Sequence, residues 1–239
     1  MWTSPLPFDA AKPAAAVTDA PGVHAITLAG ERVQLLVERA LFWPHASTLF
    51  VADVHLGKAA AFRAGGIPVP QGSTQADLAR LSALFARTGA QRLVVLGDFL
   101  HAAAGRVASL DAAFRAWRLQ HAAQSLVLIR GNHDDHAGDP PPAWGIDVVT
   151  EPHPLPPFLA CHLPVEPRTG YALCGHIHPG VWLSGAGEAP ARLPCFVVGP
   201  RRAILPAFGR FTGLAMIRPE AGETRVAIAG SRLFPLPPG

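Results

Sequence analysis

An apolar run passes directly into a polar turn in Leu93-Val-Val-Leu-Gly-Asp-Phe-Leu-His101. The apolar residues at its start predict a strand from the interior of a sheet. Asp98 follows this strand after a single glycine. In open α/β sheets, ligands bind at the carboxyl ends of the strands, so Asp98 is a candidate functional residue.

The same order of strand and polar cluster recurs along the chain. The further clusters are Asp53 with His55, Asn132 with His133, His162, and His176 with His178, after strands predicted at residues 48–52, 126–129, 158–161 and 171–174. Asp53 and His55 are two positions apart, so both side chains can point to one side of an extended segment. We expect the glycines at 97, 131 and 175 to let the backbone turn sharply beside these clusters.

Two amphipathic helices separate the first three predicted strands. The helix predicted at residues 75–88 has an apolar face made of Leu78, Leu81, Leu84 and Phe85. Ser73 or Thr74 is expected to cap this helix, and Gly89 to end it. A second helix is predicted at residues 110–121. The resulting βαβαβ order favours parallel strands joined by helical crossovers.

Short strands dominate after Pro140-Pro-Pro142 and predict a second sheet packed on the first. They lie at residues 147–149, 158–161, 171–174, 195–198, 214–217 and 225–228. No linker divides them from the rest, so we expect one domain over residues 22–239. Residues 1–21 are rich in Ala and Pro, which predicts a flexible N-terminal arm.

The composition suits a large buried core, since 49% of the 239 residues are hydrophobic and only 15% are charged. No run of about 18 apolar residues occurs, which argues against a membrane-spanning helix. Cys161, Cys174 and Cys195 form no paired framework, so we expect buried thiols and a cytoplasmic protein. The positive charge is nearly all arginine, which suits phosphate but is also typical of a GC-rich genome.

The polar clusters supply the ligand count needed for two metal ions about 3.5–4 Å apart that share one carboxylate. The predicted ligands are Asp53, His55, Asp98, Asn132, His162, His176 and His178. A mixture of imidazole and carboxylate suits Mn, Fe, Zn or Co better than Mg or Ca. The absence of thiolates from the set argues against a structural zinc site.

In this order, the clusters resemble the calcineurin-like metallophosphoesterase superfamily over residues 48–180. The resemblance implies an α/β four-layer fold, a two-sheet β-sandwich flanked by helices. It also implies that one metal binds Asp53, His55, Asp98 and His178, and the other Asp98, Asn132, His162 and His176. A metal-bridging hydroxide would then attack a phosphodiester in line with the leaving oxygen. Asn132 would hold a phosphoryl oxygen and His133 would act as general acid, with His101 as a residue that orients it.

A narrower resemblance rests on residues 53–62, Gly66-Ile-Pro-Val-Pro70, residues 97–101 and Gly199–Gly209. These segments are similar to the ligase-associated DNA damage response endonucleases, the PdeM phosphoesterases. That family implies a bacterial, manganese-dependent DNA endonuclease in DNA repair, associated with a DNA ligase and a helicase. Candidate phosphate-binding residues are Lys58, Arg63, Arg201 and Arg202. Little base-reading chemistry is visible, so we expect sequence-independent cleavage that favours frayed or single-stranded segments.

Two alternatives remain open from the sequence. The protein could be a phosphodiesterase or pyrophosphatase for small nucleotides, because the same metal chemistry serves both. It could also be a non-catalytic scaffold for a ligase or helicase, although a degraded scaffold should have lost ligands and the set here is complete.

Overall fold

The computed structural model describes residues 21–70, 72–184 and 189–238. Its first sheet has the strand order β1 to β7, with antiparallel pairs up to β4 and parallel pairs from β4 onward. The strands are β1 Val23–Leu28, β2 Glu31–Leu36, β3 Ala40–Trp43, β4 Thr48–Val51, β5 Arg92–Leu96, β6 Ser125–Ile129 and β7 Asp147–Val149.

The second sheet has the order β14-β11-β12-β13-β10-β9-β8, and β15 and β16 extend it from β12. Its strands are β8 His153–Leu155, β9 Phe158–Ala160, β10 Tyr171–Cys174, β11 Pro179–Leu183, β12 Ala191–Val198, β13 Arg202–Ile204, β14 Ala215–Met216, β15 Thr224–Ala229 and β16 Arg232–Pro235. The helices are α1 Lys58–Ala64, α2 Ser73–Thr88, α3 Ala108–Gln120 and α4 Asn132–Ala137.

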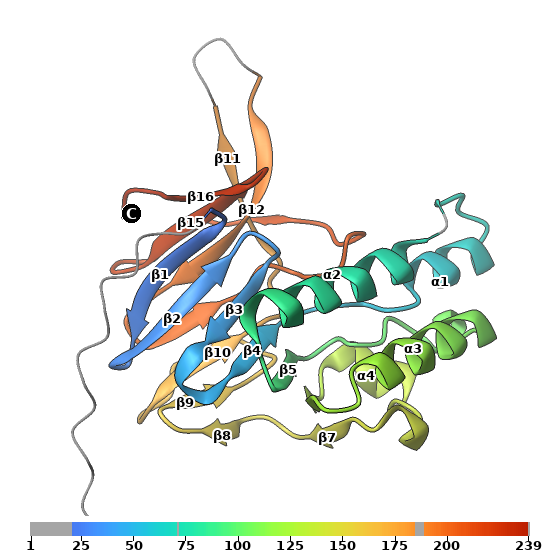
Figure 1. The fold of residues 1–239 in the computed structure, drawn as a ribbon. Helices are drawn as coiled ribbons and strands as arrows, with labels where there is room; N and C mark the ends of the chain where they lie inside the picture. Colours follow the sequence, from blue (N-terminus) through green and yellow to red (C-terminus); the bar gives the residue numbers. More distant parts are fainter. Residues whose placement is uncertain (1–20, 71, 185–188, 239) are drawn as a thin grey trace, which may run out of the picture.

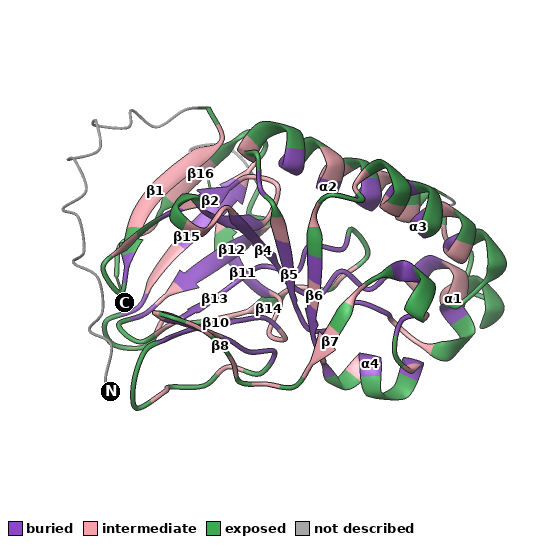
Figure 2. Ribbon diagram, turned by 60° about the horizontal axis from the view of Figure 1, so that its bottom comes forward, coloured by how far each residue is buried: buried purple, intermediate pink, exposed green. Residues whose placement is uncertain are grey.

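The two sheets pack face to face, and α2 and α3 cover the outer face of the first sheet (Figure 1). Strand β5 shows how the core is divided. Leu93 and Val95 pack with the helices, whereas Val94 and Leu96 pack against the second sheet. The central strands are therefore buried on both faces, which is why they are continuously apolar (Figure 2). The predicted α/β sandwich flanked by helices is confirmed, with its described helices on the side of the first sheet.

Most predicted elements are present with ends shifted by one or two residues, although β12 begins at Ala191 rather than at 195. The predicted helix cap is wrong. Gly72 occupies the N-cap of α2 without a side-chain hydrogen bond, and Ser73 is already helical. Gly89 does end this helix, in the left-handed conformation with φ 67°. The elements additional to the prediction are strands β1 to β3, β8, β11, β13 and β16 and helices α1 and α4.

The three cysteines are free and buried, as expected. No helix among the described residues is long and apolar enough to cross a membrane. The predicted arm at residues 1–21 lies almost wholly outside the described residues, so the division into an arm and one domain stays a prediction.

Candidate metal centre

The predicted ligands meet at one edge of the sandwich, where the parallel strands end. Two compact groups that combine a carboxylate with histidines form there: Asp53, His55 and His178, and Asp98, His162 and His176. A third group, of histidines alone, consists of His55, His101 and His133. Within each group the potential ligand atoms all lie within 4.8 Å of one another. The sequence clusters, up to 125 residues apart along the chain (from position 53 to position 178), are therefore brought together.

Asp98 lies between the two groups. Its Oδ2 is 3.8 Å from His55 Nε2, and its Oδ1 is 3.5 Å from His162 Nε2. Asn132 joins the second group, with its Oδ1 2.9 Å from His162 Nε2. One carboxylate thus faces donors of both groups, which is the position that a bridging ligand requires.

The spacing of the imidazoles fits metal coordination. His55 Nε2 and His178 Nε2 are 3.4 Å apart, and His176 Nδ1 and His162 Nε2 are 3.0 Å apart. Nitrogens bound about 2.1 Å from one cation, at tetrahedral to octahedral angles, lie about 3.0–3.4 Å from each other. The donor set therefore fits a divalent cation in each group, to which the imidazole nitrogens offer lone pairs.

Burial keeps the key imidazole neutral. The pKa of His55 is lowered to about 2, first by burial and then by the positive charge of Lys58 and the neighbouring histidines. A neutral imidazole is the form that binds metals. Asp53 is fully buried, and its two carboxylate oxygens accept the backbone N–H of His176 at 3.1 and 2.9 Å.

The backbone at the centre is strained. Five of the seven predicted ligands have positive φ without being glycine: Asp53, His55, Asp98, His176 and His178, at 53°, 51°, 51°, 70° and 52°. Such conformations cost free energy and cluster at functional sites, where the surrounding structure holds them in place. The strain turns each side chain inward at the end of its strand.

The three glycines predicted to turn the chain act in two ways. Gly97 has φ 77° and needs the conformational freedom of glycine. At Gly131 and Gly175 the reason is space instead, because a Cβ would lie 2.4 Å from Asp98 Oδ1 and 2.9 Å from Asp53 Oδ2. The prediction of a sharp turn is therefore wrong for Gly131 and Gly175. These positions need glycine because a side chain would collide with the carboxylates of Asp98 and Asp53.

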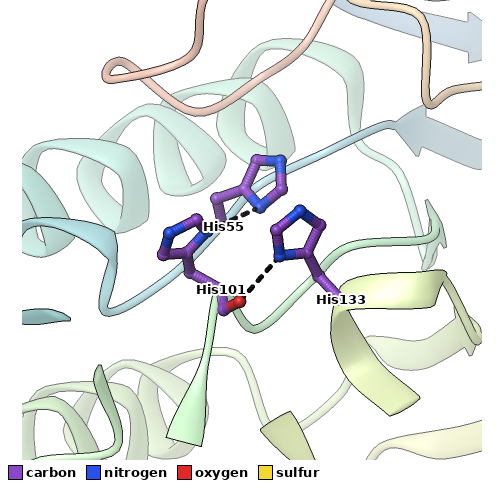
Figure 3. Close-up of side chains that lie close together, drawn as sticks. All are labelled: His55, His101 and His133. Carbon is purple, nitrogen blue, oxygen red and sulfur yellow. Dashed lines mark hydrogen bonds between the residues drawn. The ribbon is translucent and has the colours of Figure 1, made fainter. Parts of the chain in front are cut away.

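His133 is not a member of the two groups that contain Asp53 and Asp98, and lies in a third group with His55 and His101 (Figure 3). Its Nδ1 lies 2.8 Å from the His101 carbonyl oxygen, which can only accept, so Nδ1 carries the proton and Nε2 points elsewhere. The His101 ring stacks on His133 with centroids 5.0 Å apart. The His101 Nδ1 is also 3.4 Å from the His55 Nδ1 and can accept a hydrogen bond from an N–H there. With its proton on Nδ1, His55 keeps the lone pair of Nε2 for a metal.

Asp134 is a site residue to which sequence reasoning assigned no role. Its buried carboxylate accepts backbone N–H groups from Leu100 at 2.9 Å, Phe99 at 3.3 Å and Gly131 at 3.0 Å. It therefore ties the loop after β5 to the loop after β6. The signal was present, because an acidic residue three positions after the N-cap residue, as Asp134 is after Gly131, commonly bonds back to the N-cap N–H.

A family model of the calcineurin-like phosphoesterases matches residues 46–179, more than half of the chain. The chain belongs to the calcineurin-like phosphoesterase family. The structure of the nuclease MPE from Pseudomonas putida is 41% identical, with a TM-score of 0.78, over 90% of this chain and 100% of that chain. The phosphoesterase Yfce from E. coli is 16% identical over 79% of this chain and 97% of its own, with a TM-score of 0.37. No curated protein sequence matches.

Membership makes this protein a metal-dependent phosphoesterase, and the matched residues contain every predicted ligand. The family implies divalent metal ions, and the two groups around Asp98 are candidate sites for them.

Of the four cations expected to bind phosphate in this phosphoesterase, Lys58 lies nearest the centre. It begins α1 and donates its backbone N–H to the His55 carbonyl at 3.2 Å. Its pKa is lowered, mainly by burial, while the charges of Asp98 and Asp53 act in the opposite direction. Arg63, at the end of α1, lies within 3.5 Å of the carbonyl oxygens of Val69 and Pro70 and supports that loop.

Arg201 and Arg202 lie away from the centre. Strand β13 runs parallel to β10 with Arg202 opposite Ala172, so both arginines sit at the strand ends remote from His176. Arg202 is also engaged by Glu220 at 2.9 Å, Glu223 at 3.1 Å and Glu166 at 3.7 Å. We therefore leave both arginines out of the proposed substrate contacts.

Proposed function

We propose that this phosphoesterase is a two-metal phosphodiesterase that cleaves DNA internally. The observation that carries the proposal is the position of Asp98, whose two oxygens face different donor groups. Support for a nucleic-acid substrate comes from the 41% identity to a protein described as a nuclease.

The ligand assignment follows the geometry. Asp53, His55, Asp98 and His178 would hold one cation, and Asp98, Asn132, His162 and His176 the other. When bound, two such cations supply an acidified water and positive charge beside the phosphoryl oxygens. The remaining chemistry belongs to the side chains of the protein.

His133 is the proposed general acid. Because its Nδ1–H is held by the His101 carbonyl, the protonated ring presents its second N–H at Nε2. That proton passes to the alkoxide oxygen as the phosphorus–oxygen bond breaks. The Asn132 amide can donate to a phosphoryl oxygen while its Oδ1 faces His162. Lys58 adds a positive charge at the same edge.

We further propose manganese as the native metal and ligase-associated DNA repair as the setting, with a DNA ligase and a helicase as functional partners. These proposals rest on the segments around Asp53 and Gly66–Pro70 and on Gly199–Gly209. The segment Gly199–Gly209 ends against the metal-binding loop, because a Cβ at Gly209 would lie 2.4 Å from the Val54 carbonyl oxygen. The motif therefore packs directly under the metal-binding loop.

A cleavage assay with Mn²⁺ tests the proposed function. The wild-type protein should nick supercoiled plasmid and cleave hairpin or single-stranded DNA, and His133→Ala should lose this activity. His45→Ala is a matched control, because His45 is exposed and outside the site. Turnover of cyclic nucleotides or dinucleoside pyrophosphates, with intact DNA, would instead assign the protein to small nucleotides. The scaffold alternative would require that neither DNA nor an aryl phosphodiester is cleaved with any metal.

A further inference from the structure

Two aromatic side chains are exposed in the part of the chain that the structure describes, Trp182 and Phe211, at 58% and 37%. Both belong to the region that leaves the metal centre at His178. Trp182 is on β11, which starts directly after His178, and Phe211 is in the segment that returns to it. An exposed aromatic ring offers an unpaired base a face on which to stack.

The segment Gly209–Ala215, called here the rim segment, borders the first donor group at both ends. Gly209 donates its N–H to the Asp53 carbonyl at 3.1 Å, and Ala215 donates to the His178 carbonyl at 3.0 Å. The hydroxyl of Thr212 also donates to the Gly209 carbonyl at 3.0 Å and fixes the turn between them. Phe211 is therefore part of a braced segment whose two ends contact the backbone of Asp53 and His178.

Arg192 connects Trp182 to this rim segment. Its guanidinium lies 5.9 Å from the centre of the Trp182 ring, and its Nη2 donates to the Leu214 carbonyl at 2.8 Å. That carbonyl and the Ala215 N–H belong to the same peptide unit, so the Arg192 Nη2 lies within about 8 Å of the His178 carbonyl oxygen. Arg192 is thus tied to the segment that contacts His178, and Trp182 lies four residues, about 13 Å, beyond His178 on the hairpin that projects from the second sheet (Figure 1).

The charge of this region suits a polyanion. The described residues of β11, β12 and 209–218 contain Arg192, Arg210 and Arg218 and no carboxylate side chain. Arg192 uses one of its five N–H donors on Leu214, so others remain for phosphate. An aromatic ring with an arginine beside it offers a base both a stacking face and a contact for its phosphate.

We propose that Trp182, Arg192 and Phe211 form a binding track for single-stranded polynucleotide beside the metal centre. The inference rests on the proposed nuclease function and names the form of its substrate. Unpaired bases stack on Trp182 and Phe211, and Arg192 contacts a phosphate within a few nucleotides of the scissile one. Stacking needs open bases, so the track favours single strands over blunt duplex.

The test compares Trp182→Ala, Trp182→Phe and the control Leu119→Ala, which removes an 80% exposed side chain from α3. The substrates are a labelled single strand of about 20 nucleotides, longer than one single-strand site, its blunt duplex, and bis-p-nitrophenyl phosphate, all with Mn²⁺. Trp182→Ala should raise the KM for the single strand about 5- to 150-fold, the range measured for loss of one base stack. The KM for duplex should change much less, and Trp182→Phe should restore most of the loss. Arg192→Gln should reduce the salt slope of single-strand binding by about 1.

If Trp182→Ala has the same KM for the single strand as the wild type, the inference is overturned, and Trp182 would instead be a candidate contact for a protein partner. Equal losses on single strand and duplex would also overturn it, because stacking on open bases would not explain them. A wild-type protein that hydrolyses the aryl diester but no oligonucleotide would overturn the proposed nuclease function itself.

Discussion

Replacement of Asp134 tests whether its carboxylate holds the two central loops together. In Asp134→Ala, three buried backbone donors, on Phe99, Leu100 and Gly131, lose their acceptor. Each unsatisfied buried donor costs about 1–3 kcal/mol, so three of them would lower the free energy of unfolding by roughly 3–9 kcal/mol. The Asp134 carboxylate is itself buried and desolvated, which raises its pKa, so we expect a net loss in the lower half of that range, roughly 3–6 kcal/mol.

Asp134→Asn should lose less. One oxygen accepts from both Phe99 and Gly131, and an asparagine oxygen in that place would keep two of the three hydrogen bonds. We expect a loss of about 1.5–3 kcal/mol, the value of one hydrogen bond to a charged group.

Urea unfolding in EDTA measures both losses without a contribution from metal. Asp135→Ala is the matched control, because Asp135 is exposed and its ion pair with Arg130 spans 3.8 Å; its free energy of unfolding should change by less than about 1 kcal/mol. An Asp134→Ala protein within about 1 kcal/mol of wild type would refute the reasoning.

Three further predictions follow from the same contacts. His133→Ala should slow diesters with alkoxide leaving groups about 10²- to 10⁴-fold and p-nitrophenyl esters much less, and equal losses in kcat would argue against the general acid. His101→Phe keeps a ring against His133 but removes the nitrogen facing His55, so Mn²⁺ affinity should fall about 10- to 100-fold in a calorimetric titration; His101→Asn should recover part of it, and unchanged affinity in both variants would dismiss the role. Asp77 is buried, and burial raises its pKa to about 6 against the opposing charge of Arg80. Because this pKa is higher in the folded than in the unfolded protein, the stabilising effect is complete below about pH 4 and is lost as the pH rises through 6. The free energy of unfolding of the wild type should therefore fall by roughly 1–3 kcal/mol relative to that of Asp77→Asn between pH 4 and 7. A difference between the two proteins that stays constant with pH would contradict this prediction.

The sequence predicts the central strands of the fold well because these strands are buried on both faces. Strands β4, β5 and β6 are apolar on both faces, since one face meets helices and the other meets the second sheet. The helical period of α2 is equally clear. The hairpin of β1 and β2 was missed although Ala29 and Gly30, with φ of 48° and 84°, form the kind of two-residue turn that joins such strands.

The candidate site was predictable in its residue types and not in its backbone. Asp and His adopt positive φ more readily than most residues, but no pattern announces that five ligands do so. Helix α4 was also invisible, because Asn132-His-Asp-Asp-His136 has no apolar period. Its polar side chains face the centre and the solvent rather than a core.

The positions of residues outside the motifs depend on the register between paired strands, which cannot be deduced from the sequence. Arg201 and Arg202 were expected near the substrate, yet the parallel pairing of β13 with β10 places them at the opposite end of the strands. Trp182 and Phe211 gave no stacking signal in a chain with 8% aromatic residues. The rim segment with Phe211 and strand β11 with Trp182 are joined by the hydrogen bond from the Ala215 N–H to the His178 carbonyl.

The electron paramagnetic resonance spectrum of the Mn²⁺-loaded protein tests the two-metal proposal most directly. Two Mn²⁺ ions about 3.5–4 Å apart and bridged by Asp98 should give an exchange-coupled spectrum at two ions per chain. Asp98→Ala should abolish both the coupling and the phosphodiesterase activity while the protein stays folded. An active wild-type protein with one uncoupled Mn²⁺ per chain, or an active Asp98→Ala protein, would contradict the account.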